Sequence, residues 1–203
     1  MTAKLVTVLC AAVFALFTGA VQAATADPAA VPVQNLTAAL VQSMKAGSSL
    51  SMTERYQKLQ PVIEQAFALP IVTKLAVGPE WATFSPEQQQ ALITAFTRFT
   101  IANYASNFHS FDGQKFEMDD NVLTRGTEKI VRTRVIPAHD TPVSLLYRTR
   151  EVDGSWKIID VYSDGVSSLA LRRSDFAAAI AKGGAPELLS YLNRTSDDLM
   201  KSK

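Results

Sequence analysis

Hydrophobic positions in the first half of the chain recur at the spacing of α-helices. After an Ala/Pro-rich tether over residues 24–32, Leu36, Leu40 and Met44 lie four residues apart, and the run stops at Gly47. This period places the apolar side chains on one face of a helix, and glycine commonly ends helices. The pattern therefore predicts a helix that ends near Gly47.

Two more helices are expected before residue 80. Ser51 stands three residues before Glu54, the spacing of a capping box, and apolar residues at helical spacing follow to about Leu69. Pro70 fits the first turn of a short third helix, where its missing N–H leaves no bond unmade, and Gly78 ends that helix.

The clearest helix start in the sequence lies at Ser85–Gln88. It combines a serine cap, a proline at the first helical position, an acidic residue and a glutamine three residues after the serine. We expect this fourth helix to span residues 86–108. Its apolar residues cover more than one narrow stripe, which indicates a helix buried over a wide arc.

Beyond residue 113 the pattern changes to the alternation of β-strands. Val131 and Val135 alternate with Arg132 and Arg134, so one face of the sheet should be apolar and the other hydrated. Short, turn-rich connections between the segments indicate an antiparallel meander. Four strands are expected, at residues 116–124, 130–136, 143–151 and 156–162.

The last part of the chain is helical again. Ser174 can cap a helix that ends at Gly183–Gly184, and Pro186 can open a final one. The predicted fold class is α+β, with N-terminal helices, a four-stranded antiparallel meander sheet and C-terminal helices.

The first 23 residues have the features of a cleavable export signal. Lys4 precedes an apolar run from Leu5 to Ala20, and the small residues before and at Ala23 suit signal peptidase. The run is too short to span a bilayer comfortably. We therefore expect residues 1–23 to be removed, which leaves a single domain over residues 24–203 in the bacterial periplasm.

Composition narrows the functions open to this mature chain. Cleavage removes Lys4 and Cys10, the only cysteine, and leaves 19 Lys and Arg against 19 Asp and Glu. Balanced charge argues against a nucleic-acid partner, since such proteins carry a basic excess. His109 and His139 are too few for a transition-metal site. No catalytic residue, metal site or cofactor is predicted.

Aromatic and aliphatic residues are abundant for a chain without such chemistry. It has ten Phe, five Tyr and two Trp, and two of the Phe belong to the expected leader. These residues either fill an ordinary core or line a hollow that receives an apolar ligand. Periodicity alone does not distinguish a filled interior from a lined one.

Several motifs occur together in the order found in one known family. The segment Gly154–Val161 (GSWKIIDV), followed by Asp164–Ser167, resembles the signature of the MlaC-type (toluene-tolerance) family of periplasmic lipid-binding proteins. Residues 75–81 and 85–104 are similar to two of its helical segments, and the resemblance spans about residues 52–192. Leu169–Phe176 is most similar to the hopanoid-biosynthesis-associated branch, HpnM.

The resemblance implies a carrier rather than an enzyme. Such a protein shuttles a membrane lipid, either a hopanoid or a phospholipid, between the inner and outer membranes as the soluble component of an ABC-type lipid transport system. It would hold the lipid in an apolar cavity between sheet and helices. It would act as a monomer that docks transiently to inner-membrane transport machinery and, at the other end of its path, to an outer-membrane complex.

Two other functions stay open from the sequence. One is a structural or adaptor protein of the envelope with a filled core, which acts through a surface such as Arg172–Arg173. The other, less expected, is an envelope hydrolase that uses His139 with Asp140, or His109.

Fifteen residues are predicted to line the lipid cavity. They are the large apolar residues that the expected helices and strands turn inward, with the last three near the closed end: Leu59, Ile63, Phe67, Ile71, Leu75, Phe96, Phe99, Val131, Val135, Val143, Leu145, Tyr147, Trp156, Ile158 and Val166.

Overall fold

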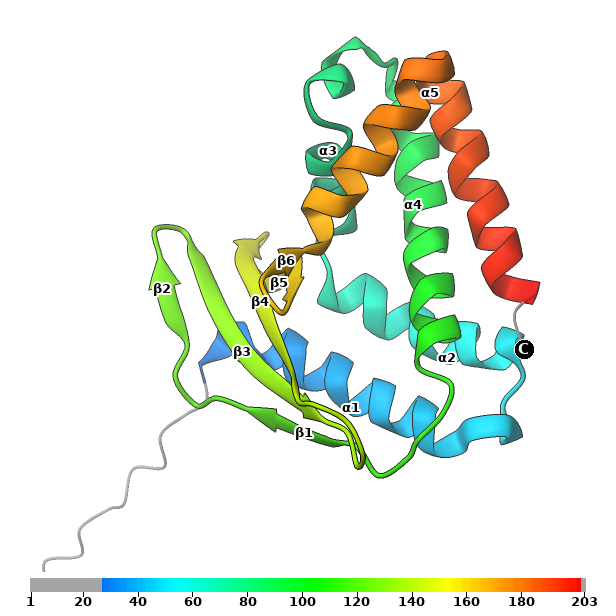
Figure 1. Cartoon of the computed structure of the whole chain (residues 1–203). Coiled ribbons are helices and arrows are strands. Elements are labelled where there is room, and N and C mark those ends of the chain that lie inside the picture. Colours follow the sequence, from blue (N-terminus) through cyan, green and yellow to red (C-terminus); the bar gives the residue numbers. More distant parts are fainter. Residues whose placement is uncertain (1–26, 202–203) are drawn as a thin grey trace, which may run out of the picture.

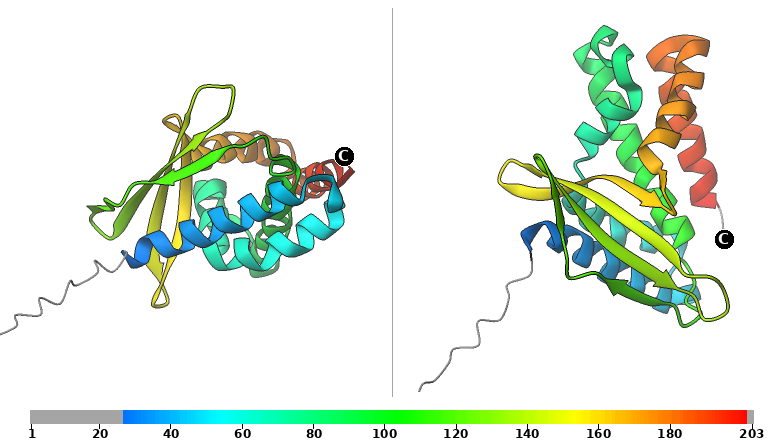
Figure 2. Two further views of the ribbon diagram at one scale, coloured as in Figure 1. Left: turned by 90° about the horizontal axis from the view of Figure 1, so that it is seen from below. Right: turned by 60° about the vertical axis from the view of Figure 1, so that its left-hand side comes forward.

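The computed structural model describes residues 27–201, and the expected leader with Cys10 lies outside them. An antiparallel sheet forms one side of the molecule (Figure 1). Two helices, α1 and α2, run across its strands, while α3, α4 and α5 stand together as a second group (Figure 2). No helix within residues 27–201 combines the length and apolarity that crossing a bilayer requires.

The N-terminal helices follow their sequence signals closely. Both predicted capping boxes form: the Ser51 hydroxyl accepts a hydrogen bond from the Glu54 N–H at 3.2 Å, and Ser85 does the same for Gln88 at 3.3 Å. Each box supplies acceptors for N–H groups that the first helical turn leaves free. The helices are α1 (Val31–Ala46), α2 (Met52–Ala66), α3 (Leu69–Val77) and α4 (Pro86–Asn107).

The expected tether over residues 24–32 is already helical at its end. A 3₁₀ turn at Pro28–Ala30 leads directly into α1. Asp27 caps this turn by accepting from the Ala29 N–H at 2.9 Å, and Lys129 holds the same carboxylate at 2.7 Å. The ammonium group of Lys129, on the sheet, therefore fixes the turn that leads into the first helix.

The sheet has six strands, so the prediction of four is wrong. The expected strand at residues 116–124 is divided, because the Asp119 carboxylate accepts from the Asn121 N–H at 2.9 Å and bends the chain. Its two parts pair separately with the same neighbour, and a further short strand follows the hairpin at Asp164. The strands are β1 (Lys115–Met118), β2 (Leu123–Arg125), β3 (Glu128–Ile136), β4 (Val143–Val152), β5 (Ser155–Ser163) and β6 (Val166–Ser167).

All strand pairs are antiparallel, in the order β1-β3-β4-β5-β6, with β2 also paired to β3. Val131 and Tyr147 face each other across β3 and β4 on the buried face, while Arg132 is exposed. The link between α2 and α3 joins the sheet directly, since the Ala68 N–H donates to the Ile158 carbonyl at 3.0 Å.

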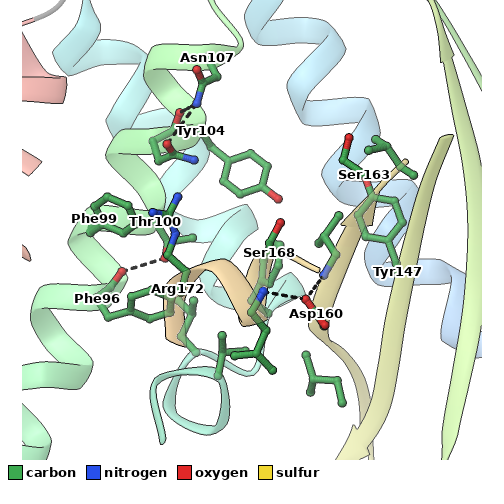
Figure 3. Close-up of a pocket in the computed structure, with 18 of the residues that line it drawn as sticks. Phe96, Phe99, Thr100, Tyr104, Asn107, Tyr147, Asp160, Ser163, Ser168 and Arg172 are labelled. Carbon is green, nitrogen blue, oxygen red and sulfur yellow. Dashed lines mark hydrogen bonds between the residues drawn. The ribbon is translucent and has the colours of Figure 1, made fainter. Parts of the chain in front are cut away.

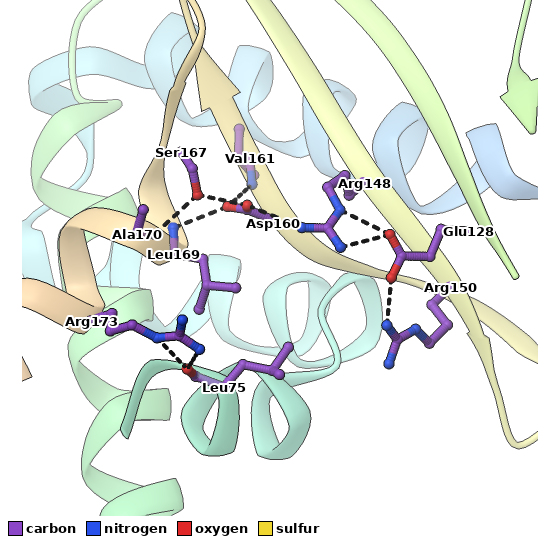
Figure 4. Close-up of polar contacts among 10 residues, drawn as sticks. All are labelled: Leu75, Glu128, Arg148, Arg150, Asp160, Val161, Ser167, Leu169, Ala170 and Arg173. Atoms are coloured by element: carbon purple, nitrogen blue, oxygen red, sulfur yellow. Dashed lines mark hydrogen bonds and ion pairs between the residues drawn. The ribbon is translucent and has the colours of Figure 1, made fainter. Parts of the chain in front are cut away.

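The last helix, α5 (Ser168–Lys201), begins six residues before the expected cap at Ser174. Asp160 accepts from the Leu169 N–H and the Ser167 hydroxyl accepts from the Ala170 N–H, each at 3.0 Å (Figure 4). Gly183 and Gly184 have non-helical backbone angles and divide α5 into two helical segments (Figure 1), so the predicted helix end and new start at this point are confirmed.

Candidate functional site: an apolar pocket between helices and sheet

A pocket of about 410 Å³ lies where α3, α4 and the start of α5 meet β4 and β5 (Figure 3). This volume is within the range of about 300–1,000 Å³ found for small-molecule sites. Most of its walls are apolar or aromatic, with a few polar side chains among them. It is lined by Phe67, Leu69, Val72, Phe96, Phe99, Thr100, Asn103, Tyr104, Asn107, Phe108, Leu145, Tyr147, Ile159, Asp160, Val161, Ser163, Ser168, Leu169 and Arg172.

One face of α4 supplies the aromatic wall. Phe96, Phe99 and Tyr104 follow one another along α4, and Phe108 comes directly after its last residue. The rings of Phe96 and Phe99 lie 6.1 Å apart, and those of Tyr104 and Phe108 are stacked at 5.6 Å. Phe67, from the end of α2, packs against Tyr104 at 5.8 Å and closes the wall.

Two tyrosines place hydroxyls in this apolar wall. The Tyr104 ring extends from α4 towards the sheet (Figure 3). Burial raises the pKa of Tyr147 to about 12, and burial also raises the pKa of Tyr104, with a smaller contribution from the neighbouring Tyr147. Both hydroxyls therefore keep their protons at neutral pH and act as neutral polar groups.

Asp160, one of the two charged residues of the pocket, is engaged by the protein itself. Its side chain is 1% exposed and accepts from the N–H groups of Val161 at 2.8 Å and Leu169 at 3.0 Å, and from the Ser167 hydroxyl at 2.7 Å. Arg148 approaches it at 3.7 Å (Figure 4). These contacts satisfy the carboxylate and hold the start of α5 against β5.

The same arginine links Asp160 to a second carboxylate on β3. Glu128 accepts from Arg148 Nε at 2.9 Å and Nη2 at 2.7 Å, and also from Arg150 (Figure 4). Burial alone would raise the pKa of Glu128, but the hydrogen bonds from Arg150 and Arg148 hold it below its usual value. Glu128 therefore stays ionised at neutral pH, and the cluster ties β3, β4 and β5 together.

Arg172 is the other charged residue of the pocket. It belongs to the second turn of α5, and its guanidinium lies 4.7 Å from the centre of the Phe99 ring on α4. Its Nη1 donates to Asp175 at 3.2 Å, and the two side chains are 31% and 43% exposed. Arg172 therefore marks the part of the pocket that reaches solvent.

The predicted lining residues separate into two groups. Five border the pocket: Phe67, Phe96, Phe99, Leu145 and Tyr147. Four are fully buried in a filled core instead: Leu59, Ile63, Val131 and Ile158.

The other six predicted residues lie elsewhere on the molecule. Ile71, Leu75, Val135 and Val143 are partly buried outside the pocket walls. Trp156 lies under the Lys129 ammonium group at 5.0 Å. Val166 is 53% exposed on β6, so it is not at the closed end of the pocket. That any of the fifteen residues binds lipid remains a prediction.

Sequence reasoning missed most of the polar lining. Asn103 and Asn107 continue the face of α4 that Phe96 and Phe99 begin, at helical spacing. Their spacing could have identified them as pocket residues, but the prediction of the lining considered apolar residues only. The sequence singled out Arg172 only as part of a possible adaptor surface and Leu169 only within the HpnM-like segment. Neither was predicted to line the pocket, because α5 begins earlier than its sequence indicates.

The two histidines stand apart from this pocket. His109 Nδ1 lies 2.7 Å from the Ser106 carbonyl, and His139 is exposed in the turn between β3 and β4. The Asp140 carboxylate accepts from the Thr141 N–H at 2.7 Å. Within residues 27–201, no group of three or more His, Cys, Asp or Glu side chains is placed to hold a metal ion.

Comparison with known proteins identifies the fold and the family. A phospholipid-binding protein from Ralstonia solanacearum, solved in complex with a phospholipid, matches with a TM-score of 0.74 and 24% sequence identity. The match covers 85% of this chain and 99% of that one. The family model described as MlaC protein matches residues 34–194, most of the chain. The chain belongs to the MlaC family.

Proposed function

We propose that this protein is a periplasmic lipid carrier. It takes up a membrane lipid, hopanoid or phospholipid, and moves it between the inner and outer membranes as the soluble component of an ABC-type transport system. Membership of a periplasmic family supports this assignment. The similarity of Leu169–Phe176 to the HpnM branch supports the hopanoid alternative, and the phospholipid bound by the Ralstonia protein supports the other.

The observation that carries the proposal is the apolar pocket. Moving roughly 30 methylenes through water unprotected would be unfavourable by about 25 kcal/mol, at about 0.8 kcal/mol for each methylene. A carrier must replace that lost burial with its own apolar surface. The walls formed by α4, β4 and β5 offer such a surface, and the solvent-facing side near Arg172 leaves space for a polar headgroup.

Release also matters for a carrier. Contacts with membrane machinery at each end of the path should be weak and short-lived, since the protein must leave both partners. We propose transient docking to an inner-membrane transporter and to an outer-membrane complex, with the protein itself monomeric.

The test is native mass spectrometry with lipid extraction on protein purified from its own periplasm. A co-purified hopanoid would support both the carrier function and the HpnM branch, and a phospholipid would support the carrier alone. Protein that is empty and takes up no lipid from liposomes would contradict the proposal. It would favour the adaptor function instead.

A further inference from the structure

The two charged residues of the pocket differ in how far the protein satisfies them. Asp160 is buried and accepts three hydrogen bonds from the chain. Arg172 is partly exposed, and its one hydrogen-bonded partner among residues 27–201 is Asp175 at 3.2 Å. The positive charge of Arg172 is therefore the charge that the pocket offers to a ligand.

The guanidinium of Arg172 is also oriented. Its central carbon lies over the Phe99 ring at 4.7 Å from the ring centre, and the Asp175 contact uses Nη1. Neither contact uses the edge formed by Nε and Nη2. An arginine edge donates two parallel hydrogen bonds, a geometry that matches two oxygens of a phosphate group.

The ion pair with Asp175 is one that a ligand can displace. Both side chains are substantially exposed, and pairs of this kind contribute about 0–1 kcal/mol, so little holds Arg172 to its neighbour. A phosphate can interact more strongly, because two of its oxygens can accept parallel hydrogen bonds from the Nε and Nη2 edge, whereas Asp175 accepts one from Nη1.

We propose that Arg172 binds the phosphate of a glycerophospholipid, and that this contact makes the pocket favour phosphate-bearing lipids over neutral ones. The proposal rests on the lipid-carrier function proposed above. Acyl chains placed against Phe96, Phe99 and Tyr147 leave the headgroup at the solvent-facing side, where Arg172 lies. A neutral lipid of the same length gains nothing from this charge.

The chain provides a matched control in the next residue. Arg173 donates to the Leu75 carbonyl from Nε at 3.2 Å and from Nη2 at 2.9 Å, and it does not line the pocket (Figure 4). Arg173→Gln and Arg172→Gln remove the same charge from adjacent positions of one helix. Only Arg172→Gln removes it from the pocket.

The experiment compares two lipids with identical chains. Dioctanoyl phosphatidylglycerol and dioctanoylglycerol are titrated, below their micelle concentrations, into delipidated full-length protein by calorimetry. We expect the wild type to bind the phospholipid about tenfold more tightly than the neutral lipid, a factor that corresponds to about 1.4 kcal/mol. Arg172→Gln should reduce this ratio to about one, and Arg173→Gln should leave it unchanged.

The outcomes separate this proposal from the carrier function. Equal binding of both lipids by the wild type, or an unchanged ratio in Arg172→Gln, would overturn the role of Arg172 and leave the carrier intact. Failure of the wild type to bind either lipid would overturn both. Inorganic phosphate alone should bind far more weakly than the phospholipid, and binding of equal strength would show a free-phosphate site instead.

A second variant keeps the test valid if Arg172→Gln does not fold. Asp175→Asn removes the competing carboxylate and leaves Arg172 in place. It should raise the preference for the phospholipid about twofold. A preference that stays the same or falls would contradict the proposed competition.

Discussion

The two groups of helices meet the sheet in different ways. Beneath α1 and α2 the interior is filled: Leu36, Leu59 and Ile63 are fully buried and pack in one cluster with Val131. Between α4, α5 and the sheet the interior is hollow, with a pocket of about 410 Å³. Both regions use large apolar residues at similar spacing, so composition does not set them apart.

The two regions differ in how the helices contact the sheet and one another. At the border of the two regions, the Ala68 N–H in the link between α2 and α3 donates to the Ile158 carbonyl, which holds this link to β5. In the hollow region, Asp160 holds the start of α5 to β5, and the Arg173–Leu75 hydrogen bonds hold it to α3. α5 meets α4 through the Phe176 and Phe96 rings and through Arg172 and Phe99. These contacts hold α5 at the margins of the pocket, and the space between them remains open.

Truncation of a residue in the filled region should have the largest effect on stability. Ile63→Ala opens a cavity in a tightly packed site, and we expect the free energy of unfolding to fall by about 3 kcal/mol. Leu145→Ala removes atoms that already face the pocket, so its loss should be about 1 kcal/mol. Urea denaturation of both variants checks the difference. Equal losses would mean that the pocket is not a true hollow.

Tyr147 lies at the border of the two regions and should make stability depend on alkaline pH. Its pKa in the folded protein is about 12, above the value near 10 of an unfolded chain. The unfolded state therefore loses this proton first. Stability is complete below about pH 10 and should fall by roughly 1 kcal/mol per pH unit up to about pH 12.

Tyr147→Phe tests this origin directly. Removing the hydroxyl should flatten the loss of stability between about pH 10 and 12, as measured by urea denaturation at each pH. Burial also raises the pKa of Tyr104, so this residue should account for part of the pH dependence that remains in the variant. Identical slopes in wild type and variant would contradict a buried, protonated Tyr147.

Sequence reasoning predicted elements well where local chemistry decides them. The capping boxes at Ser51 and Ser85 give the starts of α2 and α4 to the residue. The predicted start of α5 was wrong because the helix is capped by Asp160, which lies on another element nine residues before Leu169. The division of the first strand at Asp119 depends on a side chain that competes with the sheet for the backbone.

The pocket was less accessible from sequence than the fold. Periodicity shows that Ile63 and Phe96 both turn inward, but it contains no information on whether another element reaches them. Phe96 lines the pocket and Ile63 does not, and this outcome depends on where α5 packs. The contact between Arg172 and Phe99 joins residues 73 positions apart, beyond any local pattern.

Filling the hollow should reduce binding without loss of stability. Leu145→Trp places a large ring on β4 inside the pocket, where it competes with a lipid chain for space. We expect lipid uptake from liposomes to fall about tenfold, while the free energy of unfolding changes by less than about 1 kcal/mol. Strong destabilisation would indicate that the region is packed rather than hollow. Unchanged uptake would place the lipid elsewhere.

The smallest effect is expected at Val166, which belongs to neither region. Its side chain is 53% exposed on β6, so Val166→Ser removes little buried area and should change the free energy of unfolding by less than about 0.5 kcal/mol. Lipid uptake by the delipidated protein should also match the wild type, because this residue does not border the pocket. A clear fall in uptake would show that the lipid site extends past α5 to β6, and the boundary of the hollow region would then have to include this edge of the sheet.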